Sequence, residues 1–100
     1  MTQLSKQRTL HLRLYVAGEA PNSVAALRHL KGLLASYPLL TTKLEIIDVL
    51  LHPEPGARAG VLVTPTMIKL APPPERRIIG NLKDVEALIS VLGLTEVERE

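Results

Sequence analysis

The segment LHLRLYVAGEAPNS, residues 10–23, decides the fold of the first half of the chain. Apolar and polar side chains alternate from Leu10 to Val16, which predicts a strand with one buried face. The Gly and Pro of residues 17–22 predict a turn, after which Asn22 or Ser23 could cap a helix. Apolar residues then recur at spacings of three and four, from Val24 to Leu34, so a helix is expected over residues 23–36.

A second strand is predicted over residues 43–49, which are rich in Ile, Leu and Val. A strand, a crossover helix and a second strand form a right-handed unit with parallel strands. We therefore expect an α/β fold whose first half is a βαβ unit.

The second half of the chain is less decided. Residues 51–60 contain Pro and Gly and predict a loop or one short helix. Residues 61–70 predict a strand interrupted by a proline, and residues 76–79 a short strand. Residues 83–92 place apolar side chains at helical spacing, but residues 87–94 also fit a strand. A sequence with only one fold is expected to give the same secondary-structure signal at every level, so we note this conflict between helix and strand.

Composition limits both the size and the chemistry of the protein. One compact domain fits 100 residues, and a hydrophobic fraction of 46% supplies an aliphatic core without Phe or Trp. No cysteine is present, which excludes disulfides, thiolate zinc sites and Cys nucleophiles. We expect a flexible segment at residues 1–9, one domain at residues 10–94 and a charged, frayed tail at residues 95–100.

Location and several ligand classes can also be weighed from the sequence. Residues 1–9 lack the apolar stretch of a signal peptide, and no apolar run is long enough to span a bilayer, so a cytoplasmic protein that does not bind membranes is expected. The net charge of +2 and the two aromatic residues give no platform for nucleic acid. The three histidines, His11, His29 and His52, do not have the spacing of a metal site.

The stretch VTPTMI, residues 63–68, resembles the cis-proline strand of the thioredoxin superfamily. Redox members of that superfamily place a Cys-X-X-Cys motif opposite this proline, at the end of the first strand. The corresponding turn here, residues 17–23, holds no thiol, so thiol–disulfide exchange is excluded. The alternative interpretation is a proline on an ordinary edge strand.

A more specific resemblance runs from about residue 10 to residue 94. The chain resembles the KaiB family of circadian-clock proteins in the motifs LYVAG (14–18), PNS (21–23), IDVL (47–50), TPT (64–66) and PPPERRIIG (72–80). The resemblance implies a protein without enzymatic activity or cofactor. It also implies binding to the N-terminal ATPase ring of KaiC, competition there with the kinase SasA and, where KaiA exists, sequestration of KaiA.

The resemblance further implies two folds for one chain. The KaiB ground state is usually a tetramer with the order βαββααβ, and the binding state is a thioredoxin-like monomer with the order βαβαββα. We expect the thioredoxin-like order, with the ground-state order as the alternative and a dimer or tetramer as the self-associated form. We place the switch, with a proline that changes isomer as a hypothesis, at Pro65, Pro72, Pro73, Pro74 and Gly80.

Candidate partner-binding residues follow from charge and from the family pattern: Asn22, Arg28, Lys31, Lys43, Asp48, Lys69, Arg76 and Arg77. The alternative interpretation of each basic residue is that its side chain is exposed to solvent and contacts no partner. Ala25, Glu45 and Gly60 replace charges usual in the family, which bears on the strength of a KaiC contact. The strand at residues 43–49 is expected at a sheet edge, where a KaiA strand could pair with it. The alternative function is a cysteine-free thioredoxin-like stress protein or chaperone.

Overall fold

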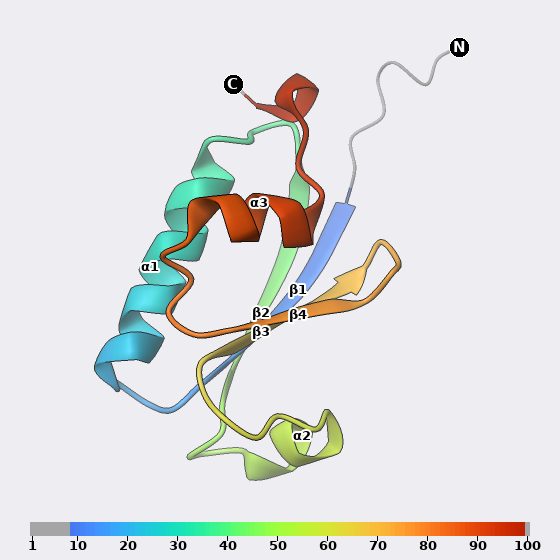
Figure 1. Cartoon of the computed structure of the whole chain (residues 1–100). Helices are drawn as coiled ribbons and strands as arrows, with labels where there is room; N and C mark the ends of the chain where they lie inside the picture. The colour runs from blue at the N-terminus through green and yellow to red at the C-terminus, as the bar shows by residue number, and fades with distance from the viewer. Residues whose placement is uncertain (1–8, 100) are drawn as a thin grey trace.

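The computed structural model describes residues 9–99, which form one four-stranded sheet with three α-helices and a short 3₁₀ turn (Figure 1). The elements, in chain order, are β1 (Thr9–Val16), α1 (Pro21–Ala35), β2 (Thr41–Asp48), α2 (Pro53–Arg58), β3 (Thr66–Ala71), β4 (Arg76–Ile79), α3 (Val85–Leu92) and the 3₁₀ turn η2 (Glu96–Glu98). The order βαβαββα is the predicted thioredoxin-like one, and the prediction is confirmed.

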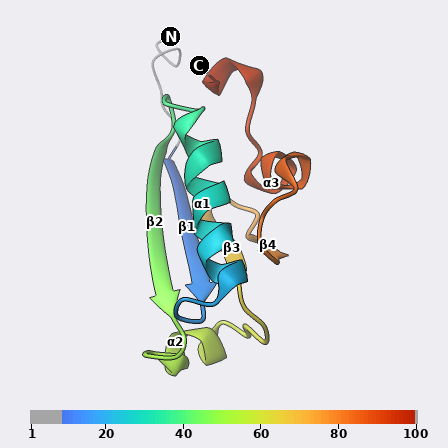
Figure 2. The same cartoon turned by 90° about the vertical axis from the view of Figure 1, so that its left-hand side faces the viewer.

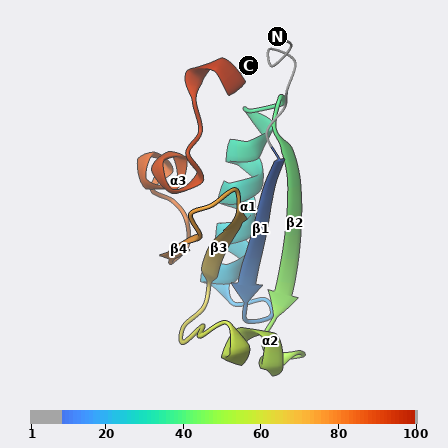
Figure 3. The same cartoon turned by 90° about the vertical axis from the view of Figure 1, so that its right-hand side faces the viewer.

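The sheet has the strand order β2-β1-β3-β4. β1 and β2 run parallel with α1 as their crossover, whereas β3 is antiparallel to both β1 and β4. α1 and α3 lie on the same face of the sheet, and β2 forms one of its edges (Figures 2 and 3). α2 lies at the end of the sheet where β1 and β2 finish (Figure 1). We call the face away from α1 and α3 the outer face.

The core lies between the sheet and the two longer helices. Leu10, Leu12 and Leu14 of β1 are fully buried, as their alternation predicts. They pack in one cluster with Leu30 of α1 and Leu92 of α3. None of the helices described between residues 9 and 99 is long and apolar enough to cross a bilayer.

The beginning of α1 differs from the prediction. Pro21 occupies the first turn and Ala20 is the N-cap, without a capping side chain. The Ser23 hydroxyl instead accepts a hydrogen bond from the Ala17 backbone N–H at 3.0 Å, which closes the loop between β1 and α1. Val24, expected in the apolar stripe, is 44% exposed.

In the second half, the ambiguous residues 87–94 are helical up to Leu92. The Asp84 side chain caps α3 by accepting from the Ala87 N–H at 3.0 Å, and Gly93 ends the helix with φ 66°. β3 begins only at Thr66, later than predicted, because residues 61–65 lie outside the ladder. The Thr64–Pro65 bond is cis, as the resemblance to thioredoxins implies, and Ala71–Pro72 and Pro73–Pro74 are also cis.

The two ends of the described chain carry the following structure. Thr9, predicted in a flexible segment, begins β1, and the rest of that segment lies outside the described residues. The tail, predicted to be frayed, forms η2, where Thr95 and Glu98 make a reciprocal capping box.

Candidate protein-binding surface

The carboxyl end of β2 is tied to the loop that follows β1. The Asp48 carboxylate accepts hydrogen bonds from the backbone N–H of Gly18 at 3.0 Å and from that of Leu50 at 2.9 Å. Gly18 has φ 53°, and a Cβ there would lie 3.2 Å from Leu50. Asp48, predicted to contact a partner, therefore has a local structural role.

A groove of about 510 Å³ runs between α1 and the edge strand β2. Arg28 and Lys31 of α1 line it together with the exposed side chains of Val24 and Ile46. Lys43 is exposed on the same strand, and Asn22 is exposed at the start of α1. The structure thus brings two of the predicted basic residues, Arg28 and Lys31, together at the groove, whereas Lys43, whose β1 neighbour is His11, projects from the outer face.

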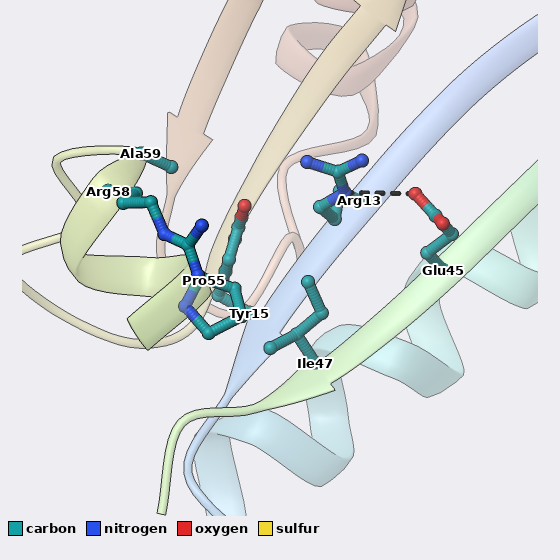
Figure 4. A pocket seen from close by; sticks show the side chains of 7 residues that line it. All are labelled: Arg13, Tyr15, Glu45, Ile47, Pro55, Arg58 and Ala59. Atoms are coloured by element: carbon teal, nitrogen blue, oxygen red, sulfur yellow. Dashed lines mark hydrogen bonds and ion pairs between the residues drawn. The ribbon is translucent and has the colours of Figure 1, made fainter. Parts of the chain in front are cut away.

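The outer face carries a hollow of about 470 Å³ between β1, β2 and α2 (Figure 4). Figure 4 shows Arg58 of α2 and Arg13 of β1 on opposite sides of Tyr15. Glu45 accepts from Arg13 Nε at 2.9 Å and shares a 2.9 Å hydrogen bond with His11 Nε2. These bonds, His11 first and then Arg13, hold the pKa of Glu45 below its ordinary value of 4.5. Bonds with Tyr15 and Glu45 raise the pKa of Arg13.

Exposed apolar side chains gather where β1 and β2 end. Leu62 is 93% exposed, Leu50 69% and Val63 50%, and they line a hollow of about 390 Å³ with Ala17 and Thr64. We call Leu50, Leu62 and Val63 the apolar end. The sequence does not indicate this cluster, because it predicts a strand interrupted by a proline over residues 61–70, whereas residues 61–65 precede β3. Three large apolar residues grouped in loops are unusual on a surface without a partner.

The remaining predicted basic residues lie on β3 and on β4, which forms the other edge of the sheet. Arg76 is exposed, and Arg77 donates to the carbonyl oxygens of Ala59 at 2.6 Å and Gly60 at 3.4 Å. Lys69 is only 6% exposed, so the prediction that it lies on a binding surface is wrong. Lys69 alternates in step with buried Met67 and therefore faces α1 and α3.

The residues assigned to the switch lie just before, within the turn of, and just after the β3–β4 hairpin. Gly80, with φ 116°, donates its N–H to the carbonyl oxygen of buried Pro65 at 2.9 Å. Pro72, Pro73 and Pro74 form the turn between β3 and β4. No group of three potential metal-ligating side chains occurs among the described residues.

Comparison with solved structures identifies proteins of similar fold. The N-terminal domain of SasA from Synechococcus elongatus superposes with a TM-score of 0.70 at 23% identity, covering 91% of this chain and 90% of that domain. Mitochondrial thioredoxin 3 of Saccharomyces cerevisiae superposes with a TM-score of 0.69 at 22% identity, covering 90% and 82%. Both likenesses support a thioredoxin-like fold.

Comparison with known sequences identifies the family of the chain. The chain is 44% identical over 91 residues to the circadian clock oscillator protein KaiB of Synechococcus sp. strain RCC307, covering 91% of this chain and 83% of that one. It is 44% identical over 88 residues to KaiB1 of Synechocystis sp., covering 88% and 84%. The KaiB domain model matches residues 13–94. The chain therefore belongs to the KaiB family.

Proposed function

We propose that this protein is a non-catalytic regulator of a circadian clock or clock-like system, which acts by binding the N-terminal ATPase ring of a KaiC homologue. The observation that carries the proposal is the identity of 44% over 91 residues to a circadian clock oscillator protein, combined with a thioredoxin-like fold. The similarity to the N-terminal domain of SasA supports competition, because two domains of one shape can occupy one surface.

We assign the main KaiC contact to the apolar end. Leu62 and Leu50 are already exposed in the free chain, so a partner that covers them removes apolar surface from water without first opening the fold. Arg28 and Lys31 line the separate groove between α1 and β2, where they would speed the approach of an acidic partner. Asn22 and Arg76 are secondary candidates on the exposed surface.

The proposal includes two further partners and a location. A SasA-type kinase competes for the same KaiC surface, and KaiA, where the organism has it, pairs with the edge of β2. The protein works in the cytoplasm and needs no cofactor. A second fold with the order βαββααβ acts as a store of inactive protein, so the apparent affinity for KaiC falls with the population of the thioredoxin-like form.

Gel filtration of the protein with a KaiC homologue and ATP tests the proposal. Co-elution that develops slowly, and that the N-terminal domain of SasA prevents, is the expected result. Independent elution at every nucleotide state would overturn it.

The second candidate is a thioredoxin-like stress protein or chaperone, which the exposed Leu62, Val63 and Leu50 favour. A chaperone would use the apolar end to hold unfolded chains. Suppression of aggregation of a denatured client, undiminished by an excess of KaiC, would favour this candidate over the clock role.

A further inference from the structure

A hollow of about 380 Å³ lies along the second half of α1, opposite the segment that joins β4 to α3. Side chains of α1 form one wall, residues 82–85 contribute the other, and Arg99 completes the lining. The apolar end lies elsewhere, beside α2 and beyond the carboxyl ends of β1 and β2 (Figure 1). The volume suits a small molecule, because ligand pockets measure roughly 300–1,000 Å³.

The permanently charged side chains that line this hollow are all basic. Arg28 comes from α1, Lys83 from the loop before α3 and Arg99 from the tail. The outer-face hollow, in contrast, includes Glu45, and the groove along β2 includes Asp48. Among the described residues, no carboxylate forms an ion pair with any of the three cations. Cations that gather from separate segments without a counter-ion favour a multivalent anion.

The acidic residues next to these cations in sequence are engaged elsewhere. Asp84, which follows Lys83, accepts a hydrogen bond from the Ala87 N–H at 3.0 Å. Glu98, which precedes Arg99, accepts one from the Thr95 N–H at 3.0 Å. Neither carboxylate lines the hollow. An incoming anion therefore does not have to displace a carboxylate from it.

The two walls of the hollow are joined to each other. His29 Nδ1 of α1 donates to the backbone carbonyl oxygen of Asn81 at 2.7 Å, and the Asn81 side chain accepts from the Lys83 N–H at 3.1 Å. Leu82 is 4% exposed and has φ 61°, a conformation that a non-glycine residue keeps only where its surroundings hold it. The site is therefore formed before a ligand arrives, which lowers the entropy cost of binding.

Gly32 leaves the middle of the α1 wall open. Glycine inside a helix is less favourable than alanine. A Cβ on Gly32 would meet nothing within 4 Å among the described residues, apart from its own neighbours on the helix. Packing within the chain therefore does not require glycine here. The apolar side chains of Leu33, Leu82 and Val85 also line the hollow, so the space can accept an apolar group.

From these observations we propose that the hollow binds a small organic phosphate. The phosphoryl group lies among Arg28, Lys83 and Arg99, and the apolar body of the ligand lies over Gly32. This site goes beyond the proposed KaiC contact and does not rest on it, because the apolar end is at a different place on the molecule.

Titration calorimetry with phenyl phosphate tests the site, in a phosphate-free buffer at low salt and above the second pKa of phosphate, about 6. Phenyl phosphate combines a dianion with an apolar ring, whereas inorganic phosphate carries the charge alone. The expected result is saturable binding of phenyl phosphate that is about tenfold tighter than that of inorganic phosphate, because the ring leaves water on binding.

Two pairs of variants localise the binding. Gly32→Leu fills the open space and should abolish binding, whereas Gly32→Ala adds one methyl group and should retain it. Lys83→Gln should weaken binding by about tenfold, because it removes a cation from the lining. Lys31→Gln removes the same charge from α1 outside this hollow, and screening should keep its effect below about twofold.

Circular dichroism checks that each variant is folded, and the lysine pair carries the test if Gly32→Leu does not fold. The proposal would be overturned by a wild-type chain without saturable binding or by equal affinity for the two phosphates. A folded Gly32→Leu variant that binds like the wild type, or equal losses in Lys31→Gln and Lys83→Gln, would also overturn it. Co-elution with KaiC is measured separately, so either proposal can fail alone.

Discussion

The guanidinium of Arg77 on β4 donates to the carbonyl oxygen of Ala59, the C-cap residue of α2, at 2.6 Å. A second, longer bond of 3.4 Å goes to Gly60. The last carbonyls of a helix lack partners within it and favour a cation. Arg77 thus joins the outermost strand to α2 across residues that are distant in sequence.

Replacing Arg77 with Ala should lower the free energy of unfolding by about 1 kcal/mol, because an exposed charged donor contributes modestly. Arg76→Ala is the matched control, since Arg76 is an exposed neighbour on the same strand, and it should change stability by less than about 0.5 kcal/mol. Urea unfolding measures both values. Equal losses in the two variants would contradict a specific role for Arg77.

The ion pairs of Glu45 should make stability depend on pH. Because the pKa of Glu45 is lowered in the folded state, its stabilising effect is present above its ordinary value of 4.5 and is lost as the pH falls through the folded value. Glu45→Gln should therefore unfold at lower urea than the wild type near neutral pH. The two midpoints should converge in acid. A difference that persists unchanged at low pH would contradict the assignment.

Asp48 should act as a structural acceptor. Asp48→Ala leaves the N–H groups of Gly18 and Leu50 without their partner, which should cost about 1–2 kcal/mol in the free energy of unfolding. Asp48→Asn keeps an acceptor oxygen and should recover most of the loss. An Asn variant as unstable as the Ala variant would mean that the negative charge, and not the two bonds, is what matters.

The apolar end should be required for KaiC binding. Leu62→Asp places a charge where a partner would exclude water, so affinity should fall by about tenfold, or about 1.4 kcal/mol. Val97→Asp is the control, because Val97 is 81% exposed on η2. Fluorescence anisotropy with a KaiC homologue measures both. Comparable losses would argue against a localised contact.

Much of the fold was predictable because local signals agree. The alternation of Leu10, Leu12 and Leu14 and the parallel βαβ unit follow from the sequence alone. Residues 87–94 were ambiguous because helical and strand periodicities overlap there. Burial of Leu88 and Leu92 against the core selects the helix, and that packing is tertiary information.

The candidate surface was less predictable than the fold. Lysine is seldom buried, so the sequence predicts Lys69 on the surface, and only the burial of Met67 and Lys69 in the structure shows its inward position. The bonds of Arg77 to Ala59 and Gly60 join residues far apart in sequence and leave no local pattern. Leu62 was missed because exposure depends on where β3 begins.

The central claim is that the chain binds a KaiC homologue in the thioredoxin-like form. Leu14 and Met67 are antiparallel neighbours on β1 and β3 in this form. The direct measurement is isotope-edited NMR of the labelled protein bound to the unlabelled N-terminal ATPase domain of KaiC. The readout is the contact between these two residues. The account predicts a complex in which the Leu14–Met67 contact persists. Absence of a complex, or a complex without that contact, would contradict it.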